Sequence, residues 1–347
     1  MKTRVLLGMS GGTDSSVAAM LLLEQGYDVT GITFRFWDEE ENPQYVKDAV
    51  RLAEQLNIKH IVKDVRSIFH DTIVRYFIDE YLAGRTPFPC AKCNNELKWS
   101  LLFEEAEKLD CEKVSMGHYA NIKYDNGHYF IAKGIDEDKD QSFFLWGLSE
   151  EQLKRIIFPL GEMTKDKVRK YAAEKGFKQV AEKKDSLGVC FCPGDYRSFL
   201  KSQIKDYPSY IYPGNFIDED ENTLGQHEGY PLYTVGQRRG LIYLNRAVFV
   251  KEIRPQTNEV VLAPLKSLYK NTFKVKGYRL IDKSLFSNNF DSIVKIRYRK
   301  QETMCRIILL DDDRLEVELK EPLESIASGQ TAVFYRNDKV LGGGFIE

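Results

Sequence analysis

The chain has 347 residues, and at roughly 150 residues per domain this length predicts two to three domains instead of one small module. A hydrophobic fraction of 43% and a charged fraction of 29% are typical of globular proteins and exclude a largely disordered chain. The net charge of −2 excludes binding of a polyanion through overall charge, so such a ligand would need a local basic patch.

The first ~120 residues alternate short apolar runs with amphipathic segments, which is typical of a doubly wound α/β fold with a parallel sheet. The predicted strands are 4–8, 28–36, 59–65 and 113–119, and the predicted helices are 15–26, 44–56, 67–83 and 94–109. Residues 84–93 hold two prolines and a glycine and are expected to form an extended loop. Further along, we expect a hairpin at 125–127, a helix start at Thr164 and another helix near Asp195.

After about residue 205, short alternating segments among Gly, Pro and Asn predict an all-β half with barrel-like domains. Its expected strands include residues 230–236 and 241–245, followed by seven more segments that end with 331–337. We therefore divide the chain into an α/β domain (1–204), a small β-rich domain (205–265) and a C-terminal β-barrel (266–347).

No stretch approaches the ~18 consecutive apolar residues of a membrane span, and the first residues lack the apolar core of a signal peptide. We therefore expect a soluble cytoplasmic protein. Six cysteines are too few for a disulfide scaffold, but four of them form two close pairs, Cys90 with Cys93 and Cys190 with Cys192. In a reducing compartment such pairs indicate metal, cluster or sulfur chemistry.

The segment Ser10–Ser16, SGGTDSS, lies between a predicted strand and a predicted helix, where a parallel sheet binds anionic ligands. It resembles the S-G-G-x-D-S loop of enzymes that split ATP into AMP and pyrophosphate, and it differs from G-x-x-x-x-G-K-[ST] and G-x-G-x-x-G. Asp14 is a candidate ligand for Mg²⁺. The alternative is a plain glycine turn in which Asp14 or Ser15 caps the helix.

Thiols on later loops of such a domain suggest that ATP turns an oxygen into a leaving group, which sulfur then displaces. We expect Cys93 at the N-terminal end of helix 94–109, where the helix dipole would lower its pKa, and Cys190 on an accessible segment. A structural Cys₄ zinc site and buried, inert thiols are the alternatives. Cys111 and Cys305 are expected to be inert.

Several blocks together resemble the tRNA-specific 2-thiouridylases, PP-loop enzymes with an adenine nucleotide alpha hydrolase-like domain that replace the C2 oxygen of the wobble uridine (U34) with sulfur. The matching blocks run in order through nearly the whole chain: GRTPFPCAKCN (84–94), MGHYA (116–120), KDQSFFL (139–145), FPLGEMTKDKVR (158–169), KKDSLGVCF (183–191), YTVGQRRGL (233–241), KIRYR (295–299) and LGGGFIE (341–347).

The resemblance implies that ATP binds with Mg²⁺, that Cys190 carries a persulfide received from a sulfur-carrier or persulfide-donor protein, and that Cys93 is the catalytic thiol. Cys93 would either release hydrosulfide or form a disulfide with Cys190. The implied partners are tRNA and the sulfur donor, with no membrane and no DNA. The implied ATP site is Gly8, Met9, Ser10, Gly11, Gly12, Thr13, Asp14, Ser15, Phe34 and Gly117. The implied contacts to tRNA are Phe88, Pro89 and Cys90 at the target base, with His118, Lys139, Asp140, Gln141, Arg297, Tyr298 and Gln330 elsewhere.

One position departs from the family pattern T-P-N-P-D-x-x-C. Cys90 stands where the pattern has an aspartate proposed as general base, and Phe88 stands for the asparagine. A thiol with an ordinary pKa of about 8.5 does not simply take over the role of a carboxylate with a pKa of about 3.9. Cys90, Cys93 and Cys190 are therefore also candidate ligands of a [4Fe–4S] cluster with one open iron. Wider alternatives are a PP-loop ligase or amidotransferase that acts on a small molecule, and a non-catalytic RNA-binding protein.

Residues 266–300 carry ten basic and two acidic side chains, a net charge of +8. Tyr269, Phe273, Tyr278 and Tyr298 are interleaved with them and are predicted to stack on unpaired bases while the basic groups neutralise phosphates. The acidic stretches 311–313 and 316–324 are expected to face away from RNA.

Overall fold

The structure is a computed structural model that describes residues 2–38, 40–182, 188–286, 289–298 and 300–347. It contains two compact units. Unit 1 comprises Met1–Thr72, Cys90–Cys190 and Asn337–Leu341, and unit 2 comprises Ile73–Pro89, Phe191–Arg336 and Gly342–Glu347. Among the described residues, no helix combines the length and the apolar character needed to cross a membrane.

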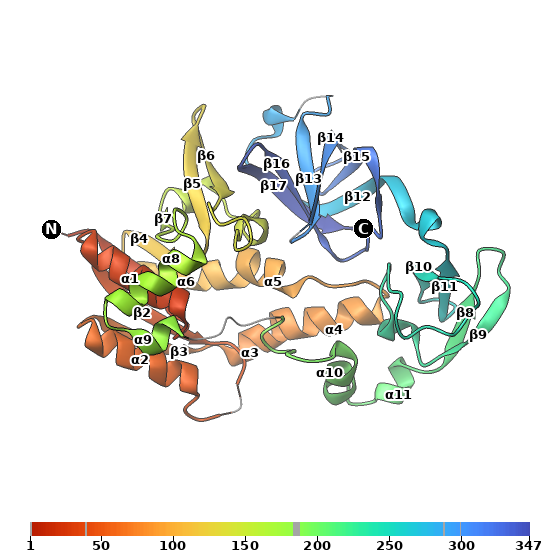
Figure 1. The fold of residues 1–347 in the computed structure, drawn as a ribbon, viewed down its shortest axis with the longest axis horizontal. Helices are drawn as coiled ribbons and strands as arrows, with labels where there is room; N and C mark the ends of the chain where they lie inside the picture. The colour runs from red at the N-terminus through yellow and green to blue at the C-terminus, as the bar shows by residue number, and fades with distance from the viewer. Residues whose placement is uncertain (1, 39, 183–187, 287–288, 299) are drawn as a thin grey trace. The chain divides into compact units, whose positions relative to one another are not determined.

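Unit 1 is built on a five-stranded parallel sheet with the order β3-β2-β1-β4-β7 (Figure 1). Val5, Leu6 and Leu7 of the central strand are fully buried, as expected for a parallel strand covered on both faces. The strands are β1 (Arg4–Gly8), β2 (Asp28–Arg35), β3 (Lys59–Asp64), β4 (Lys113–Met116) and β7 (Ile156–Ile157).

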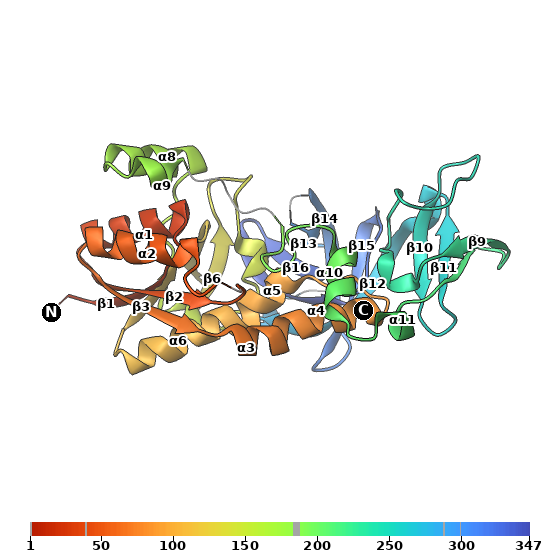
Figure 2. The ribbon, with the colours of Figure 1, turned by 90° about the horizontal axis from the view of Figure 1, so that it is seen from below.

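Helices cover both faces of this sheet. Figure 2 shows α1 (Thr13–Glu24) and α2 (Gln44–Gln55) on one face and α6 (Trp99–Lys108) on the other. Two further helices, α8 (Lys165–Glu174) and α9 (Lys178–Ala181), pack on α1. The predicted doubly wound α/β fold is confirmed.

The remaining elements of this half connect the sheet to the site. The predicted hairpin is present, since Asn126 and Gly127 both adopt positive φ between β5 and β6, as a type I′ turn requires. Thr164 caps α8 as predicted, its side chain accepting a hydrogen bond from Lys167 N. These elements are α3 (Arg66–Phe69), η1 (His70–Val74), α5 (Pro89–Lys92), η2 (Cys93–Lys98), β5 (Ala120–Asp125), β6 (His128–Lys133), η3 (Ser142–Phe144) and α7 (Glu150–Leu153).

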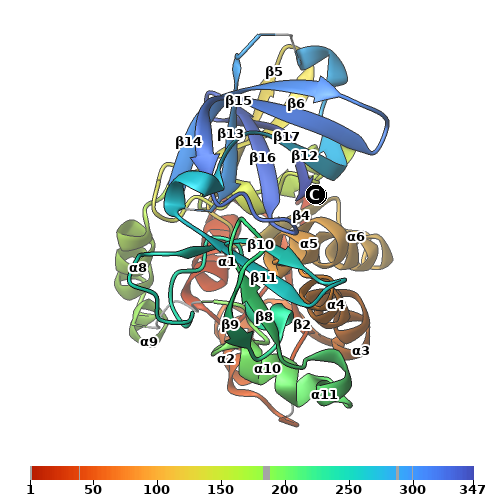
Figure 3. The same cartoon turned by 90° about the vertical axis from the view of Figure 1, so that its right-hand side faces the viewer.

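Unit 2 begins with helices and a four-stranded sheet of order β10-β11-β8-β9, which lies in the foreground of Figure 3. Asp195 caps α10, as predicted. The elements are α4 (Arg75–Leu82), α10 (Tyr196–Gln203), α11 (Tyr207–Tyr210), β8 (Gly214–Ile217), β9 (Thr223–His227), η4 (Tyr230–Leu232), β10 (Phe249–Arg254), β11 (Glu259–Ala263) and η5 (Leu265–Leu268).

Two predicted strands in this region are wrong. Residues 230–236 begin with the 3₁₀ turn η4, because Pro231 has no N–H to donate to a neighbouring strand. The Tyr230 hydroxyl donates a hydrogen bond to Leu82 O. Residues 241–245 form no strand, and Tyr243 is 90% exposed. Alternating apolar residues therefore mark a strand only where a partner strand is available.

The C-terminal strands close into an antiparallel barrel, in the order β12-β15-β14-β13-β16-β17, with β17 pairing back to β12. Val275, Val294, Leu315, Val317 and Phe334 are fully buried in it. The predicted all-β half is confirmed. Its elements are β12 (Tyr269–Leu280), η6 (Lys283–Leu285), β13 (Ser292–Arg297), β14 (Lys300–Leu309), β15 (Arg314–Glu324), β16 (Thr331–Arg336) and β17 (Lys339–Ile346).

Candidate active site

The phosphate loop follows β1 and leads directly into α1. Gly11 has a φ of +69°, and a Cβ there would lie 2.2 Å from Tyr45 O, so the position requires glycine. Gly12 is the N-cap of α1, and no side chain caps this end. Asp14 and Ser15 therefore do not act as caps. The first N–H groups of α1 remain available to an anion, which is the arrangement that binds phosphate.

Asp14 is instead held by two residues that the sequence did not single out. Lys165 Nζ lies 2.8 and 2.9 Å from the two carboxylate oxygens of Asp14, and the Tyr119 hydroxyl donates to Oδ1 at 2.7 Å. Lys165 is buried, which is unusual for a lysine unless it is paired. Its place at the start of α8 was predictable from the Thr164 cap, but its partner 151 residues away was not.

Both oxygens of the Asp14 carboxylate contact Lys165 in this structure, and the role of Asp14 as a magnesium ligand stays a prediction. No group of three described His, Cys, Asp or Glu side chains could hold a metal ion. The described residues include Cys90, Cys93, Cys190 and Cys192, so neither the Cys₄ zinc site nor the three-thiol cluster fits this arrangement.

Other residues predicted for the nucleotide lie around the same loop. A Cβ on Gly117 would lie 2.7 Å from Ser15 N, so this glycine permits β4 to approach the loop closely. Phe34 and Met9 are buried. A cavity of about 470 Å³ opens beside the loop, and its lining includes Gly11 and Ser16 of the loop region but neither Phe34 nor Gly117.

Cys90 and Cys93 lie on one helix. The segments α5, η2 and α6 follow one another without a break from Pro89 to Lys108, so the helix starts five residues earlier than predicted. Proline favours the first position of a helix, which explains this start. Cys93 is therefore in the second turn and not at the N-terminal end, and a π-helical stretch begins there.

The expectation of a lowered Cys93 pKa is wrong for this structure. Burial raises the pKa of the Cys93 thiol to about 12, and the nearby Lys98 cation offsets this only in part. Cys90 is half-buried, and burial raises its pKa too, whereas Cys190 is exposed. Desolvation thus outweighs the helix dipole that the sequence suggested.

The three thiols lie within electrostatic reach of one another. Cys190 contributes to the raised pKa of both Cys90 and Cys93, and all three belong to unit 1. Cys111 and Cys305 are buried, as expected, and burial raises the pKa of Cys305 to about 12. Much of the predicted block 183–191 lies outside the described residues.

His118 is buried against aromatic rings. Its imidazole stacks on Trp99 and meets Phe158 edge-on, and burial lowers its pKa to about 3. The ring is therefore neutral at pH 7, and Nδ1 has no hydrogen-bond partner. A direct contact with tRNA would require this ring to be uncovered.

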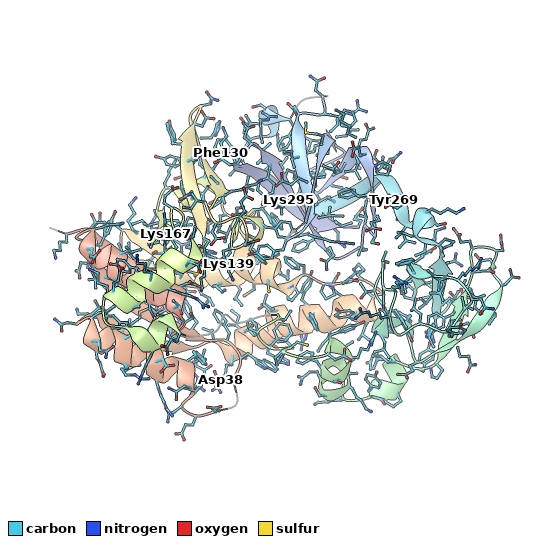
Figure 4. The ribbon with its side chains drawn as sticks, viewed as in Figure 1. Asp38, Phe130, Lys139, Lys167, Tyr269 and Lys295 are labelled. Atoms are coloured by element: carbon cyan, nitrogen blue, oxygen red, sulfur yellow. The ribbon has the colours of Figure 1, made fainter. Side chains whose placement is uncertain are left out.

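The Lys139–Gln141 segment is organised around its aspartate. The buried Asp140 carboxylate accepts hydrogen bonds from Gly134 N, Ser142 N and Ser142 Oγ. Gln141 Oε1 accepts from Tyr119 N. Asp140 therefore shapes this segment from the inside, and its expected contact with tRNA stays a prediction. The half-buried Lys139 is labelled in Figure 4.

Gln330 holds the loop that carries the expected target-base residues. Its Nε2 donates to Thr86 O at 2.9 Å and to Pro87 O at 3.3 Å, and Thr86 N donates to Ser328 O at 2.8 Å. Phe88 is half-buried and Pro89 is buried. Within unit 2, the turn after β15 therefore fixes the start of the thiol-bearing helix.

The surface of the barrel is less basic than the net charge of +8 over residues 266–300 suggests. Glu316 on β15 lies directly opposite Lys274 on β12, so the acidic stretch borders the basic strand, and its orientation relative to RNA stays a prediction. Lys295, labelled in Figure 4, pairs with Glu302. Arg297 is exposed. The sequence could not reveal that β12 and β15 are neighbours.

For two of the four aromatic rings, the prediction that they stack on bases is wrong. Phe273 and Tyr278 are buried in the barrel, and the Tyr278 hydroxyl donates to Asp311 O. Tyr269 is 48% exposed and Tyr298 is half-buried. The alternation along β12 sends Phe273 inward and the neighbouring Lys274 outward, which is the period-2 rule of strands.

The parallel sheet and the uncapped phosphate loop define a PP-loop protein, and the unit that contains them also holds three thiols. Residues 3–194 match the model of the tRNA methyl transferase HUP domain, 197–264 match the PRC-barrel domain and 270–346 match the aminomethyltransferase beta-barrel domain.

Full-length relatives place the chain more narrowly. It is 54% identical over 344 residues to a tRNA-specific 2-thiouridylase, MnmA 2, of Phocaeicola vulgatus, covering 99% of this chain and 97% of that one. It is 41% identical to the tRNA-specific 2-thiouridylase MnmA of Amoebophilus asiaticus, covering 100% and 96%. The chain therefore belongs to the tRNA-specific 2-thiouridylase family.

Among solved structures, the U34-tRNA thiolase NcsA from Methanococcus maripaludis with its [4Fe-4S] cluster matches at 19% identity and a TM-score of 0.38. The match covers 60% of this chain and 67% of that one.

The burial of Cys93 predicts how the thiols react in the ligand-free protein. Iodoacetamide at about pH 7.5 should label the exposed Cys190 at least tenfold faster than Cys93, because only the thiolate reacts. Since the Cys93 pKa is raised to about 12, its labelling should rise roughly tenfold per pH unit between about pH 8 and 10. Time-resolved peptide mass spectrometry measures both rates, with the buried Cys305 as the slow reference. Equal labelling of Cys93 and Cys190 at neutral pH would contradict this environment.

Proposed function

We propose that the protein catalyses the ATP-dependent 2-thiolation of the wobble uridine, U34, of tRNA, as a sulfurtransferase. The observation that carries the proposal is that one unit holds both an uncapped phosphate loop and three thiols within electrostatic reach. The relatives of known name are tRNA-specific 2-thiouridylases over their whole length, which supports the same substrate here.

In the first step, the C2 oxygen of the uracil attacks the α-phosphate of ATP, and pyrophosphate leaves. The N–H groups at the start of α1 are placed to stabilise the phosphates. The loop residues 8–16 contain no lysine or arginine, and Lys165 supplies a cation beside the loop. We propose that Lys165 shifts its contact from Asp14 to the departing pyrophosphate. ATP enters as its Mg²⁺ complex.

In the second step, the terminal sulfur of a Cys190 persulfide attacks C2, and the C–O bond breaks to release AMP. The Cys93 thiolate then attacks the Cys190 sulfur, which frees the thiouridine and leaves a Cys93–Cys190 disulfide. Because Cys93 is buried and protonated here, this step requires Cys93 to be uncovered when tRNA engages. Lys98 then favours its thiolate, as its effect on the Cys93 pKa already indicates.

The partners follow from the same proposal. A sulfur-carrier or persulfide-donor protein loads the exposed Cys190, and the reaction takes place in the cytoplasm. We retain residues 1–204 as the ATP and thiol domain, 205–265 as the small β domain and 266–347 as the tRNA-binding barrel. Phe88 and Pro89 are assigned to the target base, and Arg297, Tyr298 and Lys139 to the remaining tRNA.

The proposal predicts that the protein with ATP, Mg²⁺, a polysulfide donor and unmodified tRNA yields tRNA in which U34 carries sulfur, and that pyrophosphate appears only when tRNA is present. Nucleoside mass spectrometry and a coupled pyrophosphate assay measure both products. A small-molecule ligase would release pyrophosphate without RNA, and a non-catalytic RNA-binding protein would release none. Either result would contradict the proposal.

Replacing Lys165 should slow the first step without weakening tRNA binding. Lys165→Met removes the cation from the loop, so tRNA-dependent pyrophosphate release should fall by about 10²–10³-fold. Lys167→Met, at the exposed Lys167 labelled in Figure 4, should change it less than twofold and serves as the matched control. The double variant Asp14→Asn/Lys165→Met leaves no unpaired charge and should keep a normal thermal midpoint while remaining slow. A Lys165→Met protein as fast as the control would refute the assignment.

Arg297 tests the barrel surface. Arg297→Ala should weaken tRNA binding and reduce the slope of log affinity against log salt by about 1, because one exposed phosphate contact is lost. Lys283→Ala should have a smaller effect, since Lys283 already pairs with Asp312. Filter binding at several salt concentrations measures both. Identical slopes for Arg297→Ala and the wild type would place the tRNA elsewhere.

A further inference from the structure

Cys90 has no role in the two steps above, although it lies in the thiol-bearing helix. Its thiol is half-buried and lies close enough to Cys93 to influence the pKa of that thiol. As a thiol it offers redox chemistry that a carboxylate does not. Such chemistry requires a second sulfur atom within bonding reach of the Cys90 thiol.

Cys90 and Cys93 are one helical turn apart. A rise of about 1.5 Å per residue and a radius of about 2.3 Å place their Cα atoms about 5 Å apart. This separation falls within the range of roughly 4.4–6.8 Å that a disulfide spans. The helix backbone therefore permits a Cys90–Cys93 disulfide without a rearrangement of the chain.

The surroundings hold this turn in place. Asn94 Nδ2 donates to Cys90 O at 2.9 Å, and Asn95 Oδ1 accepts from Gly147 N at 2.9 Å. Lys98 favours the thiolates of both Cys90 and Cys93. Cys190 influences both as well. The thiols of Cys90 and Cys93 thus lie on one fixed helical turn. The Lys98 cation and the exposed Cys190 thiol influence both of them.

We propose that Cys90 is a resolving thiol, which takes over the disulfide that Cys93 forms with Cys190. This inference rests on the proposed function. The Cys90 thiolate attacks the Cys93 sulfur, the Cys93–Cys190 bond breaks, and a Cys90–Cys93 bond forms. The Cys190 thiolate leaves and takes up the proton that Cys90 has lost.

The electrons balance without an external oxidant. The sulfane sulfur of the persulfide is reduced as it becomes the thiocarbonyl of the tRNA, and Cys90 and Cys93 together supply the two electrons. The exchange returns Cys190 to its thiol, ready for another sulfur, and stores the oxidation within one helix. A dithiol reductant is needed only to reopen the Cys90–Cys93 bond.

One turnover in the absence of reductant tests the exchange. The full-length protein is loaded with polysulfide, desalted, mixed with ATP, Mg²⁺ and tRNA, then quenched with an alkylating agent and mapped by peptide mass spectrometry. The wild type should show mainly the Cys90–Cys93 disulfide and should accept a second sulfane sulfur on Cys190. Cys90→Ser should make one thiouridine per protein, retain the Cys93–Cys190 disulfide and reload Cys190 at least tenfold less.

Three controls separate this role from others. Cys192→Ser, at a buried cysteine near Cys190 in the sequence, should behave as the wild type. Excess dithiothreitol should bring Cys90→Ser within twofold of the wild-type rate, because external reduction replaces the exchange. Cys90→Asp offers a base but no sulfur, so it should behave as Cys90→Ser.

Other outcomes would overturn the inference. A wild type that retains only Cys93–Cys190 while making thiouridine refutes the resolving thiol and leaves the proposed function intact. Reloading by Cys90→Asp but not by Cys90→Ser would assign Cys90 to proton transfer, and stoichiometric iron with acid-labile sulfide would assign it to a cluster. A wild type that makes no thiouridine refutes the proposed function together with this inference.

Discussion

The ion pair between Lys165 and Asp14 is the contact on which the site depends. It ties the start of α8 to the start of α1, and Thr13 adds a second tie by donating its hydroxyl to Val180 O at 2.5 Å. A buried lysine without an anionic partner would cost several kcal/mol, so Lys165 keeps Asp14 as its partner in the ligand-free protein. The segment that leads towards Cys190 therefore starts from a fixed position beside the phosphate loop.

Under the proposed function, activation of the uridine by ATP and transfer of sulfur use different groups of the protein. The open end of α1 is polar and uncapped, which suits a triphosphate, whereas Cys93 is buried and protonated. A protonated thiol neither attacks nor oxidises readily. In this structure the start of α1 is therefore open to an anion, the Cys93 thiol is protonated, and the Cys190 thiol is exposed.

Local patterns predicted most of the fold, because strand, helix and turn signals depend on neighbours in sequence. The parallel sheet, the phosphate loop, the Asn126–Gly127 hairpin and the caps Thr164 and Asp195 all follow from such signals. The sequence also predicts which side of β12 is buried, because Phe273 lies at an apolar position of the alternating strand pattern.

What the sequence could not predict depends on distant contacts. The pairing of Lys165 with Asp14 joins residues far apart in the chain, and the partnership of β12 with β15 is a matter of topology. The Cys93 pKa is set by burial, which no motif reports. The family resemblance located the thiols but not their protonation state.

The most direct measurement follows the oxygen that sulfur replaces. If ATP activates the C2 oxygen of the wobble uridine at the phosphate loop, tRNA labelled with ¹⁸O at that position should pass its label to the phosphate of AMP, one atom for each thiouridine formed. AMP without the label, or label found in water or pyrophosphate, would contradict the account.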